Sequence, residues 1–515
     1  MFRFCLTAGL AVLVASGAAR ADTVDLTART GTMTLTGELL NFDGTTYRIA
    51  SQYGIVTVNA DAVNCDGPGC PGPDGFISDW MISGASDSTR ALIPPLIEAF
   101  AAEEGLGFVR QVEDASHELY VLIDVEAERD VARIRLRHTT AREGFADLVA
   151  ETADMAMALR PPGVDELMMA ADAGLGPLDA PEQARVVALD AIVVLAGNGV
   201  AVDHLPLGAL RGVLSGEVTG WAELGGPEAP ITVHLPTARS GAFGAIRSRL
   251  SAQIRRDAVR HDTPEALAEA VAGDPFGLGL TLFSAGQAER ALGLSGPCGY
   301  VVRPTLQALK SEDYPLTVPH YLHRPSWRLQ PVAQRFVRFL GTGAAQDVVA
   351  RAGFADQKID AWPMTAQGAR LIKAIRATGR DVGARSLRQV LDVLGEAERL
   401  TPTFRFEGGS DALDAPSRAS VRILAEAIRR GEMDDARLIL AGFTDAEGGP
   451  AANADLSRRR AEAVRAALFE ALGPDEAERV PLALHGFGEA MPIACDGGAW
   501  QGETNRRVEV WRVHR

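Results

Sequence analysis

Apolar residues in the middle of the chain recur at two periods, and the segments they form alternate between expected helices and expected strands. Residues 92–100 place five apolar side chains on one face of a helix that should stop near Gly105. Residues 185–196 are mostly apolar, which is typical of a buried strand, and a further helix is expected at 205–214. Alternation of this kind over residues 76–360 predicts an α/β domain with largely parallel sheets, whose loops at strand ends bind ligands.

A shorter segment rich in β-forming residues precedes this domain. Residues 34–49 and 54–59 have the pattern of short strands, and Asp43-Gly44 is a tight-turn signal within the first of these runs. The stretch that follows, as far as Gly75, is dense in glycine and proline and is typical of a linker. We therefore expect a small β domain at residues 22–73.

The last part of the chain has the pattern of a small α+β domain at residues 400–515. Pro416 suits the first turn of a helix that should end at Gly431, and Asp455 can cap a second helix. Residues 361–399 contain two helix-like stretches and are expected to form a helical linker. The strands of this domain are expected at residues 403–406, 437–443 and 507–513. The predicted fold is thus a multidomain α/β chain.

Charge and the first residues of the chain indicate its surroundings. The formal net charge of −16 argues against nucleic acid or an anionic membrane surface as the main partner. Residues 1–21 contain Arg3, an apolar stretch and the small-residue ending Ala19-Arg20-Ala21, which is the pattern of a secretory signal peptide. The mature chain is then expected to begin at Asp22. No later segment has the roughly twenty apolar residues that a transmembrane helix needs.

Two cysteines lie close together in the glycine- and proline-rich stretch. In an oxidising compartment a disulfide between Cys65 and Cys70 is the natural expectation. A zinc site is the alternative, but no second pair of cysteines or histidines accompanies these two residues. Cys298 and Cys495 can pair with each other or stay free, and we favour the free state.

Two charged residues of the C-terminal domain are placed to bind a small zwitterion. Asp445 follows the strand expected at 437–443, and Arg460 is expected about one turn inside the next helix. A carboxylate and a guanidinium placed in this way can flank an ammonium group and a carboxylate of one ligand. The alternative is a surface ion pair between Asp445 and Arg460.

Four sequence blocks carry a resemblance that favours ligand binding. Gly442–Asp445, Leu456–Ala461, Gly486–Glu489 and Asn505–Val510 resemble, in order and spacing, the OmpA-like peptidoglycan-binding domain. The resemblance implies that Asp445 takes the amine of diaminopimelate in the peptidoglycan stem peptide and that Arg460 takes its carboxylate. The family usually has histidine where this chain has Phe443, a position that supports the loop more than it contacts ligand.

A second resemblance covers the middle domain. Leu207–Gly226, Arg239–Gly241 and Ser311–Leu316 resemble the periplasmic phosphate-binding proteins of ABC importers. The resemblance implies the two-lobed periplasmic binding protein fold of type II. In that family the two lobes close on an oxyanion held by hydroxyls, by backbone amides at helix N-termini and by an arginine. The matching positions are Ser86, Ser88, Arg160, Arg239, Ser240 and Gly241.

Two departures from that family change the expected affinity. Ala242 stands where the family commonly has threonine, and Leu159 stands where it commonly has serine. Each missing hydroxyl removes one donor, worth about 1–3 kcal/mol where the anion is buried. We therefore expect weaker binding than is usual for the family, or a different anion. The alternative role of Arg160 and Arg239 is to form salt bridges across the cleft.

Signals for catalysis, metals or cofactors are weak. The chain has no Gly-x-Ser-x-Gly, His-Glu-x-x-His or phosphate-loop motif. His320 and His323 lie three residues apart without a third ligand nearby, so solvated or packed histidines are favoured over a metal site. We expect a non-enzymatic protein without a cofactor.

The sequence therefore predicts a periplasmic solute-binding protein for phosphate or another small oxyanion, anchored without covalent attachment to peptidoglycan at the cell outer membrane. An ABC importer is a candidate partner. The alternative is a cell-envelope scaffold whose cleft has lost ligand binding. These expectations follow from the two resemblances together with the expected signal peptide.

Overall fold

A computed structural model describes residues 23–31, 33–71, 76–286, 288–296, 300–377, 384–406, 410–494 and 504–514. The expected signal peptide, Cys298 and Cys495 lie outside these ranges. The chain divides into two compact units, and each is considered separately. The first contains the N-terminal part up to Ser78 together with Arg328–Gln334, and the second contains Asp79–Trp327 and Arg335–Arg515.

The first unit is built on a five-stranded antiparallel sheet with the strand order β4-β3-β2-β1-β5. Its small core includes Val24, Leu26 and Ile49. The expected turn lies between β2 and β3, where Asp43 accepts hydrogen bonds from two following backbone amides. Cys65 and Cys70 are joined by a disulfide. The strands are β1 Thr23–Ala28, β2 Thr34–Phe42, β3 Thr46–Ser51, β4 Gly54–Asn59 and β5 Val63–Asp66.

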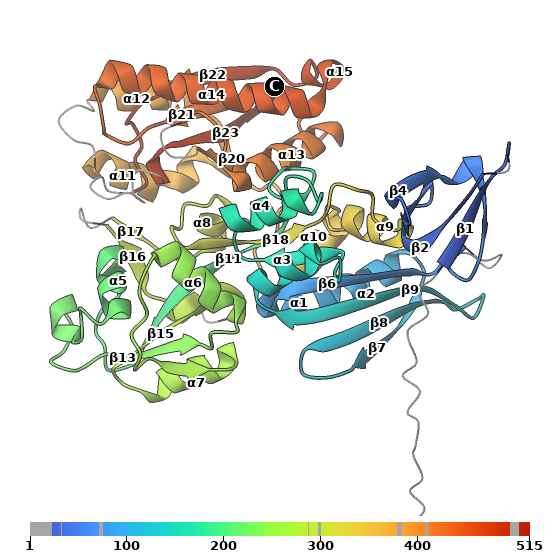
Figure 1. Cartoon of the computed structure of the whole chain (residues 1–515). Helices are drawn as coiled ribbons and strands as arrows, with labels where there is room; N and C mark the ends of the chain where they lie inside the picture. Colours follow the sequence, from blue (N-terminus) through green and yellow to red (C-terminus); the bar gives the residue numbers. More distant parts are fainter. Residues whose placement is uncertain are drawn as a thin grey trace, which may run out of the picture. The chain divides into compact units, whose positions relative to one another are not determined.

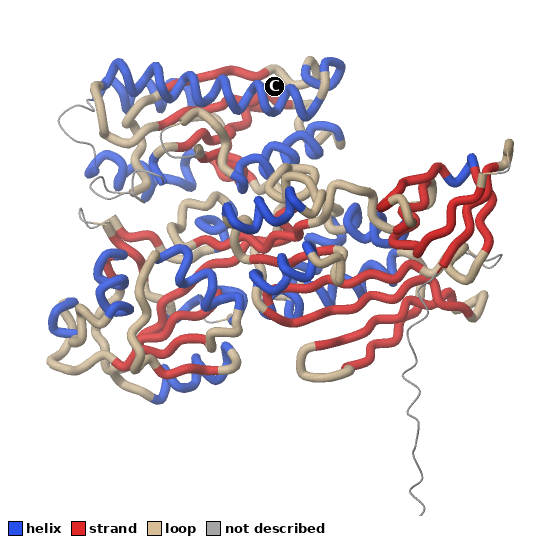
Figure 2. Tube along the Cα trace, in the orientation of Figure 1, coloured by secondary structure: helices blue, strands red, loops and turns tan. Residues whose placement is uncertain are grey.

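The middle of the chain forms two α/β lobes, as the sequence predicted, joined by two strands that they share (Figures 1 and 2). The long strand β11 pairs with β18 over its first part and with β15 over its second part. Because β18 also pairs with β10 of the first lobe, β11 and β18 form the connection between the lobes. The sheet order is β14-β13-β15-β11-β18-β10-β6-β9-β8-β7.

The expectation of largely parallel sheets is wrong. The segments β7, β8 and β9 form an antiparallel meander, and β11 runs antiparallel to both of its neighbours. Short hairpin connections and the two shared strands force this mixed arrangement. The strands are β6 Ser78–Ala85, β7 Gly107–Val112, β8 His117–Asp124, β9 Arg129–Thr139, β10 Met155–Ala158, β11 Ala184–Ala196, β12 His204–Pro206, β13 Thr232–Pro236, β14 Val259–His261, β15 Gly277–Leu282, β16 Gly293–Ser295, β17 Val301–Val302 and β18 Thr317–His323.

Helices flank the strands of both lobes (Figure 1). The helix expected from residue 92 is α2, and Gly105, which has a φ of +70°, follows its end. The helices are α1 Ser86–Ala91, α2 Ile93–Glu103, α3 Ala141–Val149, α4 Val164–Asp172, α5 Leu207–Ser215, α6 Gly241–Leu250, α7 Pro264–Gly273, α8 Leu306–Lys310, α9 Pro331–Phe339 and α10 Gly343–Arg351.

The C-terminal part is a five-stranded sheet with helices on both faces. Side chains of β21 alternate, so that Leu438 and Leu440 face α13 and α14 while Ile439 and Phe443 face the opposite core. The strand order is β19-β20-β23-β21-β22. The elements are β19 Ala361–Pro363, α11 Gly368–Ala377, α12 Ala384–Leu394, β20 Glu398–Arg405, α13 Ala415–Arg429, β21 Ala436–Phe443, α14 Pro450–Leu472, α15 Pro474–Ala477, β22 Leu482–Gly486 and β23 Arg507–His514.

Two expectations for this part need correction. Asp455 does not cap a helix, because α14 begins earlier, at Pro450, with Gly449 as its N-cap residue. Arg460 therefore lies near the middle of α14 and not in its second turn. The segment 361–399 contains the expected helices, but it also supplies β19 to the sheet, and its Val390 and Leu394 pack against Ile439. It thus shares a core with the sheet and does not merely link two domains.

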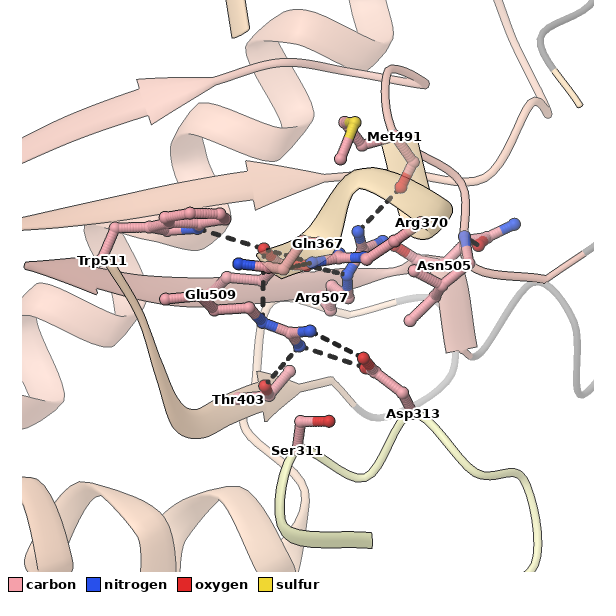
Figure 3. A network of polar contacts seen from close by, with 12 residues as sticks. Ser311, Asp313, Gln367, Arg370, Thr403, Met491, Asn505, Arg507, Glu509 and Trp511 are labelled. Carbon is pink, nitrogen blue, oxygen red and sulfur yellow. Dashed lines mark hydrogen bonds and ion pairs between the residues drawn. The ribbon is translucent and has the colours of Figure 1, made fainter. Parts of the chain in front are cut away.

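A buried ionic network joins the middle and C-terminal parts (Figure 3). Arg399 of β20 donates to both carboxylate oxygens of Asp313, at 2.7 and 3.1 Å. On its other side Arg399 lies 3.5 Å from Glu509, which also accepts hydrogen bonds from Arg370 and Arg507. Burial alone would raise the pKa of Asp313, but Arg399 outweighs it, so that the pKa falls to about 2.

This network predicts a specific dependence of stability on pH. The folded pKa of Asp313, about 2, lies below the unfolded value of about 3.9. Its ionised form therefore stabilises the fold fully above the unfolded pKa, and this contribution is lost as pH falls toward 2. Asp313→Asn should lower the free energy of unfolding by about 2 kcal/mol near pH 7 and by almost nothing at pH 2.

Urea denaturation of both proteins at a series of pH values measures this difference. The control is Asp262→Asn, which removes an exposed carboxylate and should leave the free energy of unfolding nearly unchanged at every pH. A difference between Asp313→Asn and the unchanged protein that is independent of pH would contradict the prediction.

Candidate functional site

Asp445 lies directly beyond the end of β21, on the loop that leads to α14. The amide of the preceding Thr444 donates to the carbonyl of Gly488 at 2.8 Å, which fixes the start of this loop. The Asp445 carboxylate accepts a hydrogen bond from Nη1 of Arg506 at 2.7 Å and is only 9% exposed as a residue. Sequence analysis placed Arg506 in a family block but gave it no role.

Arg460 projects from α14 as a nearly buried cation. Its guanidinium lies over the ring of Phe406 at 5.1 Å, and its Nε is 3.8 Å from the carboxylate of Asp411. The side chain is only 4% exposed, and its Nε and Nη1 donate no hydrogen bond to any residue in the described ranges. Burial lowers the pKa of Arg460, while the nearby carboxylates of Asp411 and Asp445 oppose this shift. Because arginine remains charged at neutral pH, these are unused donors on a charged group.

Aromatic and amide side chains hold the surrounding loops. Phe443 is buried between Phe487, at 5.6 Å between ring centroids, and the guanidinium of Arg507, at 4.3 Å. Asn453 of α14 donates to Glu489 at 2.7 Å. Asn505 accepts from the amides of residues 493 and 494. Arg507 is the first residue of β23 and is buried in the core, whereas Arg506, which directly precedes the strand, reaches Asp445.

The N-terminus of α6 in the second lobe is already occupied by a carboxylate from the first lobe. The backbone amide of Ala242 donates to Oδ2 of Asp87 at 3.0 Å, and the Ser240 hydroxyl donates to the same carboxylate at 3.2 Å. A Cβ on Gly241 would lie 2.8 Å from both Asp87 and Ala85. The lobes are therefore in contact where the sequence predicted an oxyanion, and Asp87 uses the expected donors.

Ser88 is committed to a buried chain of polar groups and does not face the cleft. Its hydroxyl lies 2.7 Å from Nδ1 of His320, whose Nε2 lies 3.5 Å from Asp190. Asp190 in turn accepts a hydrogen bond from the Ser284 hydroxyl at 2.5 Å. Ser88, His320 and Asp190 have the composition of a catalytic triad, but all three are completely buried, so a substrate cannot reach Ser88 in this structure. Ser86 is partly exposed at the start of α1.

The two arginines expected at the oxyanion site have different surroundings. Arg160 forms a bidentate pair with Glu166 at 2.6 and 2.7 Å, and this hydrogen bonding raises the pKa of Arg160. The salt bridge is therefore within the first lobe and not across the cleft. Arg239 is exposed and makes no contact with the cavity described next.

A large cavity beside α6 brings together Arg160, Ser240 and Gly241. Its volume is about 1020 Å³, and it is lined from both lobes. Three further arginines line it that sequence reasoning did not identify, and no aspartate or glutamate is among its lining residues. Because these arginines come from separate elements, only the tertiary fold brings them together. They are Arg142, Arg247 and Arg260.

No three histidine, cysteine, aspartate or glutamate side chains of the described ranges gather as a metal site would require. Among the helices of the same ranges, none combines the length and hydropathy of a bilayer span.

Parts of this chain are similar to known proteins. The sodium-type flagellar protein MotY of Vibrio parahaemolyticus is 33% identical over 105 residues, which cover 20% of this chain and 34% of that protein. The phosphate-binding protein PstS of Borreliella burgdorferi is 22% identical over 180 residues, covering 33% of this chain and 64% of that protein. The chain thus spans about a third and somewhat under two thirds of these two relatives.

A solved structure of an ABC-type phosphate transport receptor from Vibrio cholerae is similar to this chain, with a TM-score of 0.42 and 16% identity. That similarity covers 53% of this chain and 98% of the receptor. The model of the OmpA family matches residues 405–506, and the model of a PBP superfamily domain matches residues 115–342. This chain therefore carries a domain of the PBP superfamily followed by a C-terminal domain of the OmpA family.

Proposed function

We propose that this protein binds peptidoglycan through its C-terminal domain and carries an anion-binding module of the periplasmic binding protein type. The observation that carries the first part is Arg460, a nearly buried guanidinium with two unused donor groups. Leaving such donors unpaired is costly, and a ligand carboxylate would satisfy both with charge-assisted hydrogen bonds. The expected signal peptide and a peptidoglycan partner support a periplasmic location near the outer membrane.

The proposed ligand is the diaminopimelate residue of the stem peptide. Its carboxylate would pair with Arg460, and its ammonium group would share the carboxylate of Asp445 with Arg506, which already lies 2.7 Å away. Charge complementarity of this kind requires both protein charges, because removing one leaves a ligand charge buried without a partner. Asp445 and Arg460 are therefore equally important for the proposed binding.

The cleft of the PBP superfamily domain can serve either of two functions, solute binding or a scaffold role. The cavity lined by Arg142, Arg160, Arg247 and Arg260 supports binding of an anion, because no carboxylate lines it in a chain of net charge −16. We propose solute binding at this cavity as the first function, with an ABC importer as a candidate partner. The observation that favours a scaffold is Asp87, which occupies the donors that phosphate would use.

The peptidoglycan proposal predicts the behaviour of two variants. Arg460→Ala and Asp445→Ala should each weaken co-sedimentation with diaminopimelate-type peptidoglycan at least tenfold, since losing a hydrogen bond to a charged group costs about 1.5–3 kcal/mol. Arg459→Ala removes an exposed arginine from the same helix and should bind normally. Melting temperatures of all variants report whether the fold is retained. Unchanged sedimentation of both variants would contradict the proposed site.

A second prediction tests the role of Asp87. Asp87→Ser frees the amide of Ala242 and the hydroxyl of Ser240 and removes a negative charge, so phosphate should bind at least tenfold more tightly than to the unchanged protein. Isothermal titration with inorganic phosphate measures this change. Arg239→Ala should leave the affinity unchanged, since this arginine does not line the cavity.

Two outcomes of this titration separate the two functions. Phosphate binding to the unchanged protein supports the solute binder, and binding only after Asp87→Ser supports a scaffold whose cleft is closed by its own carboxylate. Equal affinities of the two proteins would show that Asp87 does not control the site.

A further inference from the structure

A second cavity, of about 800 Å³, lies between the PBP superfamily domain and the OmpA family domain. The two domains form one compact unit, and Ala419 of α13 packs into the core that contains Leu189 and Tyr321. The cavity is lined on one side by residues near β11 and β18 and on the other by α13 and α14. Its volume lies within the about 300–1,000 Å³ that is usual for small-molecule sites, which often form at domain interfaces.

Arginines dominate the polar part of this cavity. Five arginines line it, against two glutamates. Arg185 donates through Nη1 to the carbonyl of Val337 at 3.0 Å, and Arg422 donates through Nη1 to the carbonyl of Pro181 at 2.8 Å. These bonds hold one arginine from each domain in place at the cavity wall.

Among these arginines, Arg429 forms an ion pair with Glu476 at 2.7 Å, whereas Arg185 and Arg422 have only a distant carboxylate as ion-pair partner. The carboxylate of Glu426 lies 3.9 Å from Arg185 and 3.9 Å from Arg422, so one carboxylate serves two guanidinium groups at long range. Burial lowers the pKa of Arg185 to about 10, and the neighbouring charge of Arg422 contributes to this shift. Arg324 adds a third positive charge close to both. A bound anion would relieve this repulsion.

Part of the remaining cavity wall is apolar. Leu413 and Val421 line it near α13, and Ala467 and Ala471 line it from α14. A small inorganic anion would leave these surfaces without contact, whereas an apolar group on the ligand would bury them. A guanidinium cluster next to an apolar wall therefore favours a ligand that carries both an anionic group and an apolar group.

We propose that this cavity binds an organic anion in which a phosphate or carboxylate group contacts Arg185 and Arg422 and an apolar chain lies along α13 and α14. The site is separate from the Asp445–Arg460 site and from the cleft beside α6, so it does not depend on the functions proposed above. Because its two key arginines belong to different domains, a bound ligand would also resist separation of the domains.

Isothermal titration of the full mature chain with octyl phosphate tests the proposal. Inorganic phosphate tests the anion alone, and octyl glucoside tests the apolar chain alone. We expect octyl phosphate to bind at least tenfold more tightly than either, because only octyl phosphate satisfies both parts of the cavity. Inorganic phosphate can also bind in the cleft beside α6, so only phosphate binding that Arg422→Gln weakens reports on this cavity. Equal binding of inorganic phosphate and octyl phosphate at this cavity would show that the apolar wall does not contribute and would overturn the proposal.

Two variants locate the binding. Arg422→Gln should weaken binding of octyl phosphate at least tenfold, while Arg437→Gln, which removes an exposed arginine on β21, should not change it. Ala467→Leu fills the apolar part without altering charge and should also weaken binding, which keeps the test decisive if Arg422→Gln fails to fold. Unchanged affinity in Ala467→Leu and in a folded Arg422→Gln, or no binding to the unchanged protein, would overturn the proposal.

Discussion

The arrangement of the C-terminal domain depends on one carboxylate that is completely removed from solvent. Glu509 of β23 is fully buried, and it accepts hydrogen bonds from Arg370, Arg507 and Trp511. An ion in such surroundings is tolerable only when its charge and its lone pairs are satisfied together. The three residues come from α11 and from β23 itself, so this one carboxylate fixes how the helix lies on the sheet.

The same carboxylate reaches beyond its own domain through Arg399. This arginine lies between Glu509 and Asp313, and it also donates to the hydroxyl of Thr403 at 3.1 Å. Asp313 belongs to the segment Ser311–Leu316, which sequence analysis treated only as part of a family resemblance. Its carboxylate is thus a structural partner of the following domain. This chain of charges sets the position of β20 against the PBP superfamily domain (Figure 3).

Local patterns in the sequence were sufficient to predict most individual helices and strands. The apolar run of β11, the proline that begins α13 and the β-branched residues of β23 each gave the correct element, because their periodicity is a property of neighbouring residues. The start of α14 was missed because an aspartate inside a helix has the same local signal as a capping aspartate. The direction of strand pairing was missed because it depends on connections between distant segments.

In the candidate sites, too, local sequence patterns placed some residues, and only the tertiary fold brought the others together. The four family-like blocks placed Asp445 at the end of a strand and Arg460 on a helix, and both residues occupy these positions in the structure. The hydrogen bonds of Ser88 to His320 and of Ala242 to Asp87 join residues more than 150 positions apart. No spacing rule connects such residues, and the arginines of the two cavities likewise meet only after the chain has folded.

The contact of Asp87 with the N-terminus of α6 has a consequence for how the protein can respond to its surroundings. A carboxylate carried on the chain is always present beside these donors, at an effective concentration that for tethered groups is commonly about millimolar. A dissolved anion that uses the same donors must compete with this fixed group. Trace amounts of such an anion would leave the lobes unchanged, and only abundant anion would displace the carboxylate. In the proposed solute-binding role, the cleft would therefore respond to an abundant anion and not to a scarce one.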